Sequence, residues 1–144
     1  MIRPARGEDL DRIVWLENAA FPDPWPPDLL AYEMRHPNSI MLVASWSEDG
    51  PGCGYAAFRQ GGGEAELLRV AVDPAEQGRG IGKALVARGL IDLRNLDIQR
   101  CFLEVRPNNA SAITCYTRLG FGLAGRRRNY YRDGSDALVY AREL

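Results

Sequence analysis

The stretch Val70-Ala71-Val72-Asp73-Pro74-Ala75-Glu76-Gln77-Gly78-Arg79-Gly80-Ile81-Gly82-Lys83 decides how the rest of the chain is organised. The residues from Leu67 to Val72 are mostly aliphatic or β-branched, and Asp73-Pro74 ends that run. Glycines follow at three alternate positions, and an amphipathic segment runs from Ile81 to Leu93. The pattern predicts a strand, a loop and a helix. Because glycine has no Cβ and the first turn of a helix has unpaired N–H groups, such a loop can hold a pyrophosphate.

Two common phosphate-binding motifs do not fit this loop. A dinucleotide fingerprint would need a glycine three residues after Gly80, where Lys83 stands. A P-loop would need a glycine five residues before Gly82 and a hydroxyl residue after Lys83, but Gln77 and Ala84 occupy those places. The remaining pattern suits a phosphate group without Mg²⁺, and it consists of Gln77, Gly80 and Gly82 with the basic residues Arg79 and Lys83.

Length and composition predict one globular domain over residues 1–144. With 46% hydrophobic and 26% charged residues, a chain of this length buries about two thirds of its unfolded surface. A net charge of −1 argues against direct binding of nucleic acid, although the cluster Arg126-Arg127-Arg128 indicates a local site. The chain has no apolar run near the roughly 20 residues needed to cross a bilayer and no signal-peptide pattern, so we expect no membrane contact and a cytoplasmic location.

Cysteine and histidine give no metal or nucleophile pattern. Cys53, Cys101 and Cys115 are widely spaced within apolar runs, which predicts reduced core residues. The only histidine, His36, stands beside Pro37 at a predicted helix end, so a structural or surface role is expected. Neither a metal site nor a serine-hydrolase triad has support.

The order of predicted elements gives an α/β domain with a mixed sheet. Strands are expected at 2–5, 39–46, 53–60, 65–72, 100–106, 121–131 and 137–141, and helices at 8–20, 28–35, 81–93 and 109–119. The three strands between residues 39 and 72 form an antiparallel meander. The strands at 67–72 and 100–105 are parallel because a helix joins them. The proline-rich connection at 21–27 carries Phe21 and Trp25, which either line a cleft or cover the core.

A second informative stretch covers residues 103–121. Strand alternation places Glu104 opposite Leu103 and Val105, near the C-terminal end of a central strand where ligands of open α/β sheets bind. Asn109 suits a helix N-cap, and Tyr116 lies two turns further on about the same face. Taken singly, such a glutamate is usually a solvated charge and such a tyrosine is usually core. Together with the glycine loop they indicate a catalytic crevice.

On these residues the sequence resembles the GNAT superfamily of acetyl-CoA-dependent N-acetyltransferases. Gln77-Gly78-Arg79-Gly80-Ile81-Gly82 matches the acetyl-CoA motif (R/Q)-x-x-G-x-(G/A). Residues 109–121 look like the later motif Asn-x-x-Ala-x-x-x-Tyr-x-x-x-Gly-Phe. The resemblance extends over nearly the whole chain. It implies a three-layer fold in which a mostly antiparallel sheet of about seven strands, with a splayed parallel central pair at the cofactor site, is flanked by about four helices.

The resemblance implies acetyl-CoA as the cofactor. The strand backbone at 70–72 would hold the pantetheine arm, the glycine loop would cradle the pyrophosphate, and a backbone N–H near 70–72 would face the thioester oxygen. The implied cofactor-binding residues are Val70, Ala71, Val72, Gln77, Gly78, Arg79, Gly80, Ile81, Gly82, Lys83 and Asn109.

The resemblance also implies direct acetyl transfer in a ternary complex. Glu104 would take the amine proton, directly or through water, and Tyr116 would protonate the departing thiolate. An α-amine with a pKa of about 7.7 to 8.0 suits this mechanism better than a lysine amine near 10.4, since only the free base attacks. Cys115 points elsewhere on the helix, which disfavours a covalent acetyl-cysteine.

More narrowly, three segments resemble the bacterial ribosomal-protein alanine N-acetyltransferases: 70–74, 103–106 and 127–131, with Phe21 and Trp25 similar to the Phe-Pro-Trp segment of that group. The implied acceptor is the N-terminal α-amine of a protein, an N-terminal alanine of a ribosomal protein, bound by a monomeric enzyme. The implied acceptor-binding residues are Phe21, Trp25, Arg128, Tyr130 and Tyr131. Strand register leaves open which tyrosine faces the groove. The arginine-tyrosine segment is alternatively a charged hairpin edge.

Two departures from the narrower pattern concern the acceptor. Pro107-Asn108 follows the Leu-Glu-Val-Arg run, and the connection at 21–27 is longer than the family's compact form. A polyamine or aminoglycoside acetyltransferase is therefore the alternative enzyme, and a non-catalytic acyl-CoA sensor is the alternative from another class.

Overall fold

A seven-stranded mixed sheet with the strand order β1-β2-β3-β4-β5-β7-β6 runs through the molecule. The computed structural model describes all residues, 1–144. Its strands are β1 (Ile2–Pro4), β2 (Ser39–Ser45), β3 (Gly52–Gly61), β4 (Glu64–Val72), β5 (Arg100–Val105), β6 (Gly122–Arg127) and β7 (Ala137–Glu143). Its helices are α1 (Leu10–Ala20), α2 (Pro27–Arg35), α3 (Ile81–Asn95) and α4 (Ala110–Arg118). The mixed α/β class and the element order predicted from the sequence are confirmed.

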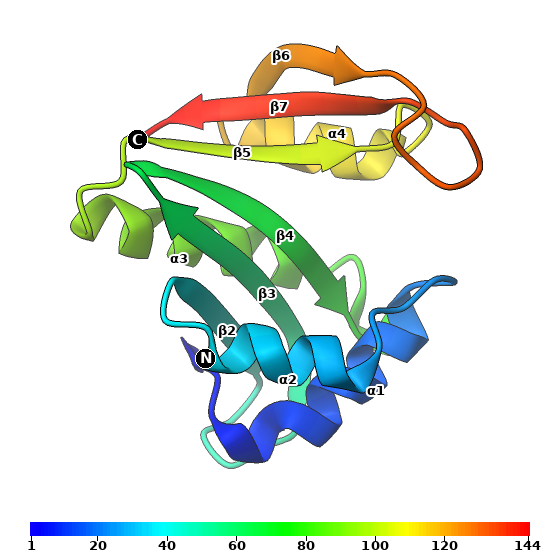
Figure 1. Cartoon of the computed structure of the whole chain (residues 1–144). Helices are drawn as coiled ribbons and strands as arrows, with labels where there is room; N and C mark the ends of the chain where they lie inside the picture. The colour runs from blue at the N-terminus through cyan, green and yellow to red at the C-terminus, as the bar shows by residue number, and fades with distance from the viewer.

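The centre of the sheet is split between its only parallel pair, β4 and β5. These strands pair only at Glu64↔Arg100, Ala65↔Cys101 and Glu66↔Phe102. Figure 1 shows them starting together and diverging toward their arrowheads, with α3 as the crossover between them. Beyond Glu66, the edge of β4 that faces β5 therefore has N–H and C=O groups without a strand partner. This opening is the predicted splay.

A β-bulge at Leu68 changes which residues of β4 face which side. Ala57 pairs with Arg69 while the next residue, Phe58, pairs with Leu67, so Leu68 is the extra residue. Ala65 and Leu67 point toward α3 before the bulge, and Val70 points there after it. A bulge bends its strand and increases the local twist, which here carries the end of β4 away from β5.

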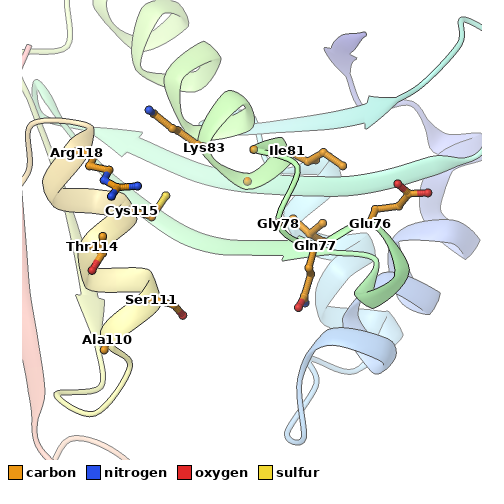
Figure 2. Close-up of a pocket in the computed structure, with 13 residues that line it drawn as sticks. Glu76, Gln77, Gly78, Ile81, Lys83, Ala110, Ser111, Thr114, Cys115 and Arg118 are labelled. Atoms are coloured by element: carbon orange, nitrogen blue, oxygen red, sulfur yellow. The ribbon is translucent and has the colours of Figure 1, made fainter.

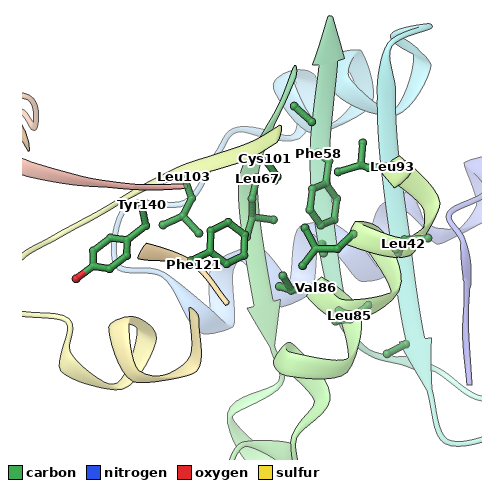
Figure 3. Packing of buried hydrophobic residues seen from close by; sticks show 14 of the residues in the cluster. Leu42, Phe58, Leu67, Leu85, Val86, Leu93, Cys101, Leu103, Phe121 and Tyr140 are labelled. Carbon is green, nitrogen blue, oxygen red and sulfur yellow. The ribbon is translucent and has the colours of Figure 1, made fainter. Parts of the chain in front are cut away.

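Helices cover both faces of the sheet and bury two apolar clusters. Under α3, the larger cluster includes Phe58, Leu67, Val86 and Leu103, which Figure 3 shows interlocked between helix and strands. Under α1 and α2, a smaller cluster includes Tyr55, which is fully buried. The helices thereby fix the positions of β4 and β5 on both sides of the split. No helix combines the length and apolar character that a membrane crossing requires.

The strand predicted at 121–131 ends earlier in the structure, at Arg127. Asn129 adopts a left-handed conformation with φ 54°, and its N–H donates to Asp136 at 3.0 Å. These features turn the chain into a loop over 128–136 before β7 begins. The prediction that Tyr130 and Tyr131 lie on a strand was therefore wrong, and both lie on this loop.

Candidate active site

The glycine loop and α4 enclose a cavity of about 600 Å³, which we call the loop cavity. Figure 2 shows the loop on one side and the side chains of α4 on the other, with Lys83 reaching over the space between them. The lining residues are Val72, Glu76, Gln77, Gly78, Gly80, Ile81, Gly82, Lys83, Ala110, Ser111, Thr114, Cys115 and Arg118. Most of the residues predicted for a phosphate group therefore meet in one cavity.

The backbone of the loop presents free donors to this cavity. Gly78 and Gly80 have φ values of 83° and 79°, a backbone conformation that residues with a side chain rarely adopt. The first turn of α3 begins with Ala84 N–H donating to Gly80 O at 3.0 Å, so the N–H groups of residues 81–83 have no backbone acceptor. These donors, the positive end of the helix dipole and Lys83 together favour an anion.

The sequence interpretation missed the α4 wall of the loop cavity. Ser111, Thr114 and Arg118 lie three and four residues apart, which places them on one helix face. That polar stripe was readable from the sequence, but its direction toward the glycine loop depended on how α4 packs.

Four residues predicted in the cofactor set do not line the loop cavity: Val70 and Asn109, which line a second cavity described below, and Arg79 and Ala71. Arg79 lies 3.4 Å from Glu76, and its guanidinium is 5.9 Å from the centre of the Trp46 ring. Ala71 is buried in the cluster under α1. The N–H of Asp73 donates to Cys53 O, so strand alternation also directs the backbone groups of Ala71 toward β3 and leaves those of Val70 and Val72 on the free edge.

A second cavity of about 540 Å³, the splay cavity, fills the opening between β4 and β5. It is lined from β4, β5, α4 and the 21–27 connection, by residues that include Phe21, Leu68, Val70, Gly82, Glu104, Asn109, Tyr116 and Tyr131. Gly82 and Cys115 line both cavities, so the two adjoin. The structure thus brings the predicted Glu104, Asn109 and Tyr116 to one space next to the anion loop.

Glu104 is held by two donors, one at the end of β6 and one in the loop that follows it. Arg127 Nε donates to Glu104 Oε1 at 2.9 Å, and the Tyr130 hydroxyl donates to Oε2 at 2.8 Å. The Glu104 side chain is 11% exposed, so these contacts are partly shielded from water. The hydrogen bond to Glu104 raises the pKa of Tyr130 to about 12, which keeps this hydroxyl a donor.

The arginine-tyrosine segment places one unpredicted residue at the site. Arg127 contacts Glu104, whereas the predicted Arg128 is exposed and lines neither cavity. Tyr131 lines the splay cavity, and the Arg106 guanidinium stacks 3.9 Å from its ring centre. Both tyrosines therefore gather at the site, in different ways. The sequence contained this arginine run but not the register that selects Arg127.

Tyr116 presents a hydroxyl that makes no hydrogen bond within the protein. Its ring packs edge-to-face on Phe121 with centroids 5.9 Å apart. Burial raises the pKa of Tyr116 to about 12, so it is a protonated donor at neutral pH. Burial also raises the pKa of the neighbouring Cys115 thiol, which makes Cys115 a poor nucleophile. All three cysteines are free thiols, as predicted.

The 21–27 connection is anchored by a buried ion pair. Glu17 has no exposed surface and accepts from Arg69 Nε and Nη2, both at 2.9 Å, and from Trp25 N–H at 2.8 Å. The Arg69 guanidinium lies 4.0 Å from the Phe21 ring centre and 5.0 Å from the Trp25 ring centre. Phe21 lines the splay cavity and Trp25 lines the groove beside it, and both also pack against the cluster under α1 and α2. The cleft and the core alternatives therefore both describe these residues.

The unpaired β4 edge, the glycine loop and the two adjoining cavities fit a long ligand with a strand-like arm and an anionic end. This combination defines an acyl-CoA-dependent acyltransferase, with acetyl-CoA as the cofactor. The chain belongs to the acetyltransferase (GNAT) family, whose model matches residues 10–121. The prediction of an acetyltransferase made from the sequence is confirmed.

Individual relatives cover nearly the whole chain. The chain is 37% identical over 142 residues to the N-alpha-acetyltransferase RimI of Mycobacterium tuberculosis, covering 94% of this chain and 87% of the relative. It is 34% identical over 136 residues to the ribosomal protein bS18-alanine N-acetyltransferase of Escherichia coli, covering 92% and 90%. The crystal structure of the ribosomal-protein-S18-alanine N-acetyltransferase from Escherichia coli superposes with a TM-score of 0.90 at 31% identity, covering 100% of this chain and 93% of that one.

Proposed function

We propose that this acetyltransferase modifies the N-terminal α-amine of a protein, an N-terminal alanine of a ribosomal protein. The observation that carries the proposal is the pairing of a held carboxylate, Glu104, with a free tyrosine donor, Tyr116, in one cavity beside the anion loop. Relatives at 34% and 37% identity bear the names of N-terminal acetyltransferases, and one is named for ribosomal protein bS18 alanine.

In this proposal β4 and the glycine loop would hold the cofactor. The free edge beyond Glu66 would bond the pantetheine arm through the backbone of residues 70–72, where Val70 and Val72 face away from β3. The N–H groups of residues 81–83 and the Lys83 ammonium would bind the pyrophosphate. Asn109 Oδ1 accepts a hydrogen bond from the Ala112 N–H at 3.3 Å, which leaves the side-chain NH₂ of Asn109 for the pantetheine arm. Bound acetyl-CoA supplies an electrophilic thioester carbonyl and a thiolate leaving group.

Proton transfer is assigned to groups on opposite sides of the splay cavity. Glu104 receives the proton that the attacking amine loses, and Arg127 and Tyr130 orient the carboxylate for that task. Tyr116 donates its hydroxyl proton toward the leaving sulfur. Desolvation raises the pKa of Tyr116, and it would also raise the pKa of a thiol bound beside Tyr116. The pKa of the acid and the pKa of the leaving thiol therefore stay close to each other.

The acceptor enters along a groove beside the splay cavity, which we call the outer groove. It has a volume of about 520 Å³, and its lining includes Trp25, Leu29, Glu66, Leu68 and Phe102. Leu68 lines both spaces, so the outer groove leads to Glu104 from the α2 side. A channel of this kind accommodates a chain that continues beyond its first residue. Trp25 lines the outer groove, and Phe21 and Tyr131 line the splay cavity to which it leads.

A peptide panel tests the acceptor. Enzyme and acetyl-CoA are incubated with a peptide that starts with alanine, with the same peptide blocked at its N-terminus and carrying a lysine, and with spermidine. Intact mass should show one added acetyl group on the free alanine peptide only, because its α-amine is the more readily deprotonated. Acetylation confined to the lysine side chain or to spermidine would exclude the proposed acceptor.

Replacement of Gly80 by alanine should weaken cofactor binding about tenfold. A residue with a Cβ in the left-handed conformation costs about 1 to 2 kcal/mol, and the loop would relax away from the geometry that binds the phosphate. Calorimetric titration with CoA measures the change. Gly7→Ala is the matched control, since Gly7 has no positive φ and open space around its Cβ position. Equal affinity of Gly80→Ala and the parent would contradict the assigned role of the loop.

We also propose four general features of the working enzyme. The whole chain, 1–144, acts as one acetyltransferase domain and as a monomer in the cytoplasm. With a net charge of −1, it meets its ribosomal-protein substrate without direct contact with nucleic acid.

A further inference from the structure

A second carboxyl group lies against Glu104 and is not explained by the fold. Glu66 stands on β4 opposite Phe102 of β5, and Glu104 follows Phe102 by two residues on the same face. The register therefore places the two carboxyl groups on the same face of neighbouring strands, beside the point where β4 and β5 separate. Glu66 also lines the outer groove, so the pair stands where that groove reaches the splay cavity.

Glu66 differs from Glu104 in the hydrogen-bond donors that its carboxyl group has. Both oxygens of Glu104 already accept protein hydrogen bonds, from Arg127 and Tyr130. Glu66 is partly buried, yet it has no ion pair and no protein donor other than a protonated carboxyl. Like-charged carboxylates on neighbouring strands repel each other, and a proton shared between them removes the repulsion. The site is therefore built to bind one proton more readily than Glu104 alone would.

We propose that Glu66 and Glu104 work as one carboxyl pair that accepts the proton of the attacking amine, with the proton coming to rest on Glu66. The inference rests on the proposed function and deepens it. Once Glu104 has passed the proton on, it is again charged, because Arg127 and Tyr130 compensate that charge, and Glu66 is the neutral donor that hydrogen-bonds to it. Glu66 then returns the proton to water through the outer groove.

During transfer, the amine nitrogen forms a bond to the acetyl carbon, and the C–S bond breaks with its electron pair on sulfur. The nitrogen's N–H bond breaks, its electrons stay on nitrogen, and the proton goes to the carboxyl pair. Sulfur receives a separate proton from Tyr116. No oxidant, reductant or further reactant is needed.

The surroundings of the carboxyl pair set its pKa close to the pH at which the enzyme works. Desolvation, and then the nearby Glu104 charge, raise the pKa of Glu66 to about 7. Arg127 from β6 and Arg59 from β3 oppose this rise, and Arg59 also pairs with Glu33 of α2. A base whose pKa is near the working pH combines availability with driving force. Below pH 7 the pair already holds its proton, so activity should rise with pH through this range.

The test is the pH dependence of kcat/KM for the alanine peptide in the parent and in Glu66→Gln. Below pH 6.5 the parent should show a limiting slope of about 2 in log units, because the pair and the α-amine must both lose a proton. Glu66→Gln should show a slope of about 1 and a kcat about 10²-fold lower, with unchanged CoA affinity. Glu143→Gln on β7 is the matched control, because Glu143 lines neither cavity and no part of the outer groove. Its carboxylate is exposed and 3.5 Å from Arg100, and kcat should stay within about twofold of the parent.

A titration of the carboxyl groups without turnover tests the Glu66–Glu104 pair without any acceptor. Carboxyl ¹³C resonances of the glutamates, titrated in the parent and in Glu104→Gln, should show Glu66 with a pKa near 7 that falls in the variant. A Glu66 resonance that titrates at the ordinary value of about 4.3 overturns the proposal, as does a Glu66→Gln profile equal to that of the parent. Absence of peptide acetylation by the parent would instead refute the proposed function and leave the carboxyl titration to decide on the pair.

Discussion

Glu17→Ala should destabilise the fold by about 3 to 5 kcal/mol, the largest loss expected from a single truncation outside the apolar clusters. Glu17 has no exposed surface, and its carboxylate receives four hydrogen bonds, from Arg69 twice, Tyr55 and the Trp25 backbone. The Arg69 side chain is only 19% exposed. Without Glu17, a shielded guanidinium loses its counter-charge, which is costlier than never having buried the pair.

Urea unfolding at pH 7, analysed by linear extrapolation, measures this loss. Glu17→Gln keeps the size and part of the acceptor capacity, so it should fall between alanine and the parent. Asp11→Ala on the same helix is the exposed control and should change stability by less than about 0.5 kcal/mol. If Glu17→Ala lost under about 1 kcal/mol, the buried pair would have no role in holding α1 to the sheet.

The same ion pair connects stability to acceptor binding. Arg69 lies against both Phe21 and Trp25, and Glu17 fixes the Trp25 backbone. A partly stabilised variant such as Glu17→Gln should therefore raise KM for the peptide more than it raises KM for acetyl-CoA. The proline-rich connection needs such an anchor because its prolines remove backbone donors that would otherwise tie it down.

Local signals were enough to predict the elements around the glycine loop. Gly78 and Gly80 have positive φ values and open space at their Cβ positions, whereas Gly82 lies in the first turn of α3 close to Val70 and Val72. Asn109 was predicted as an N-cap and accepts from Ala112 N–H. These features depend on a few consecutive residues, so single-sequence patterns describe them well.

Contacts between distant strands could not be predicted in the same way. The bulge at Leu68 places Glu66 and Arg69, three residues apart, on the same side of β4, where strict alternation would separate them. Glu17 meets Arg69 across 52 positions of the sequence. The selection of Arg127 rather than Arg128 depends on the register of β6 against β7, which itself shifts between Leu123 and Gly125. Sequence patterns carry these residues but not their pairings.

Tyr116→Phe should lower kcat by about 10²-fold while leaving CoA affinity unchanged. The hydroxyl has no hydrogen bond within the protein, so its removal breaks no structural contact, and the ring still packs on Phe121. The loss falls on protonation of the leaving thiolate, a step for which positioned acids contribute about 10² to 10⁴ in rate. Steady-state kcat and a separate CoA titration measure the two quantities. Tyr140→Phe, in the same apolar cluster but lining neither cavity, is the control.

The pH profile of the parent enzyme gives an independent check on Tyr116. Because burial raises its pKa to about 12, Tyr116 keeps its proton throughout the range in which the enzyme is folded and assayed. The kcat of the parent should therefore stay level from pH 8 to 10 instead of falling on the alkaline side. A decline centred near pH 9 that is absent from Tyr116→Phe would show a more acidic donor than burial predicts. If Tyr116→Phe turns over within about threefold of the parent, the thiolate takes its proton from water, and Tyr116 only shapes the cavity.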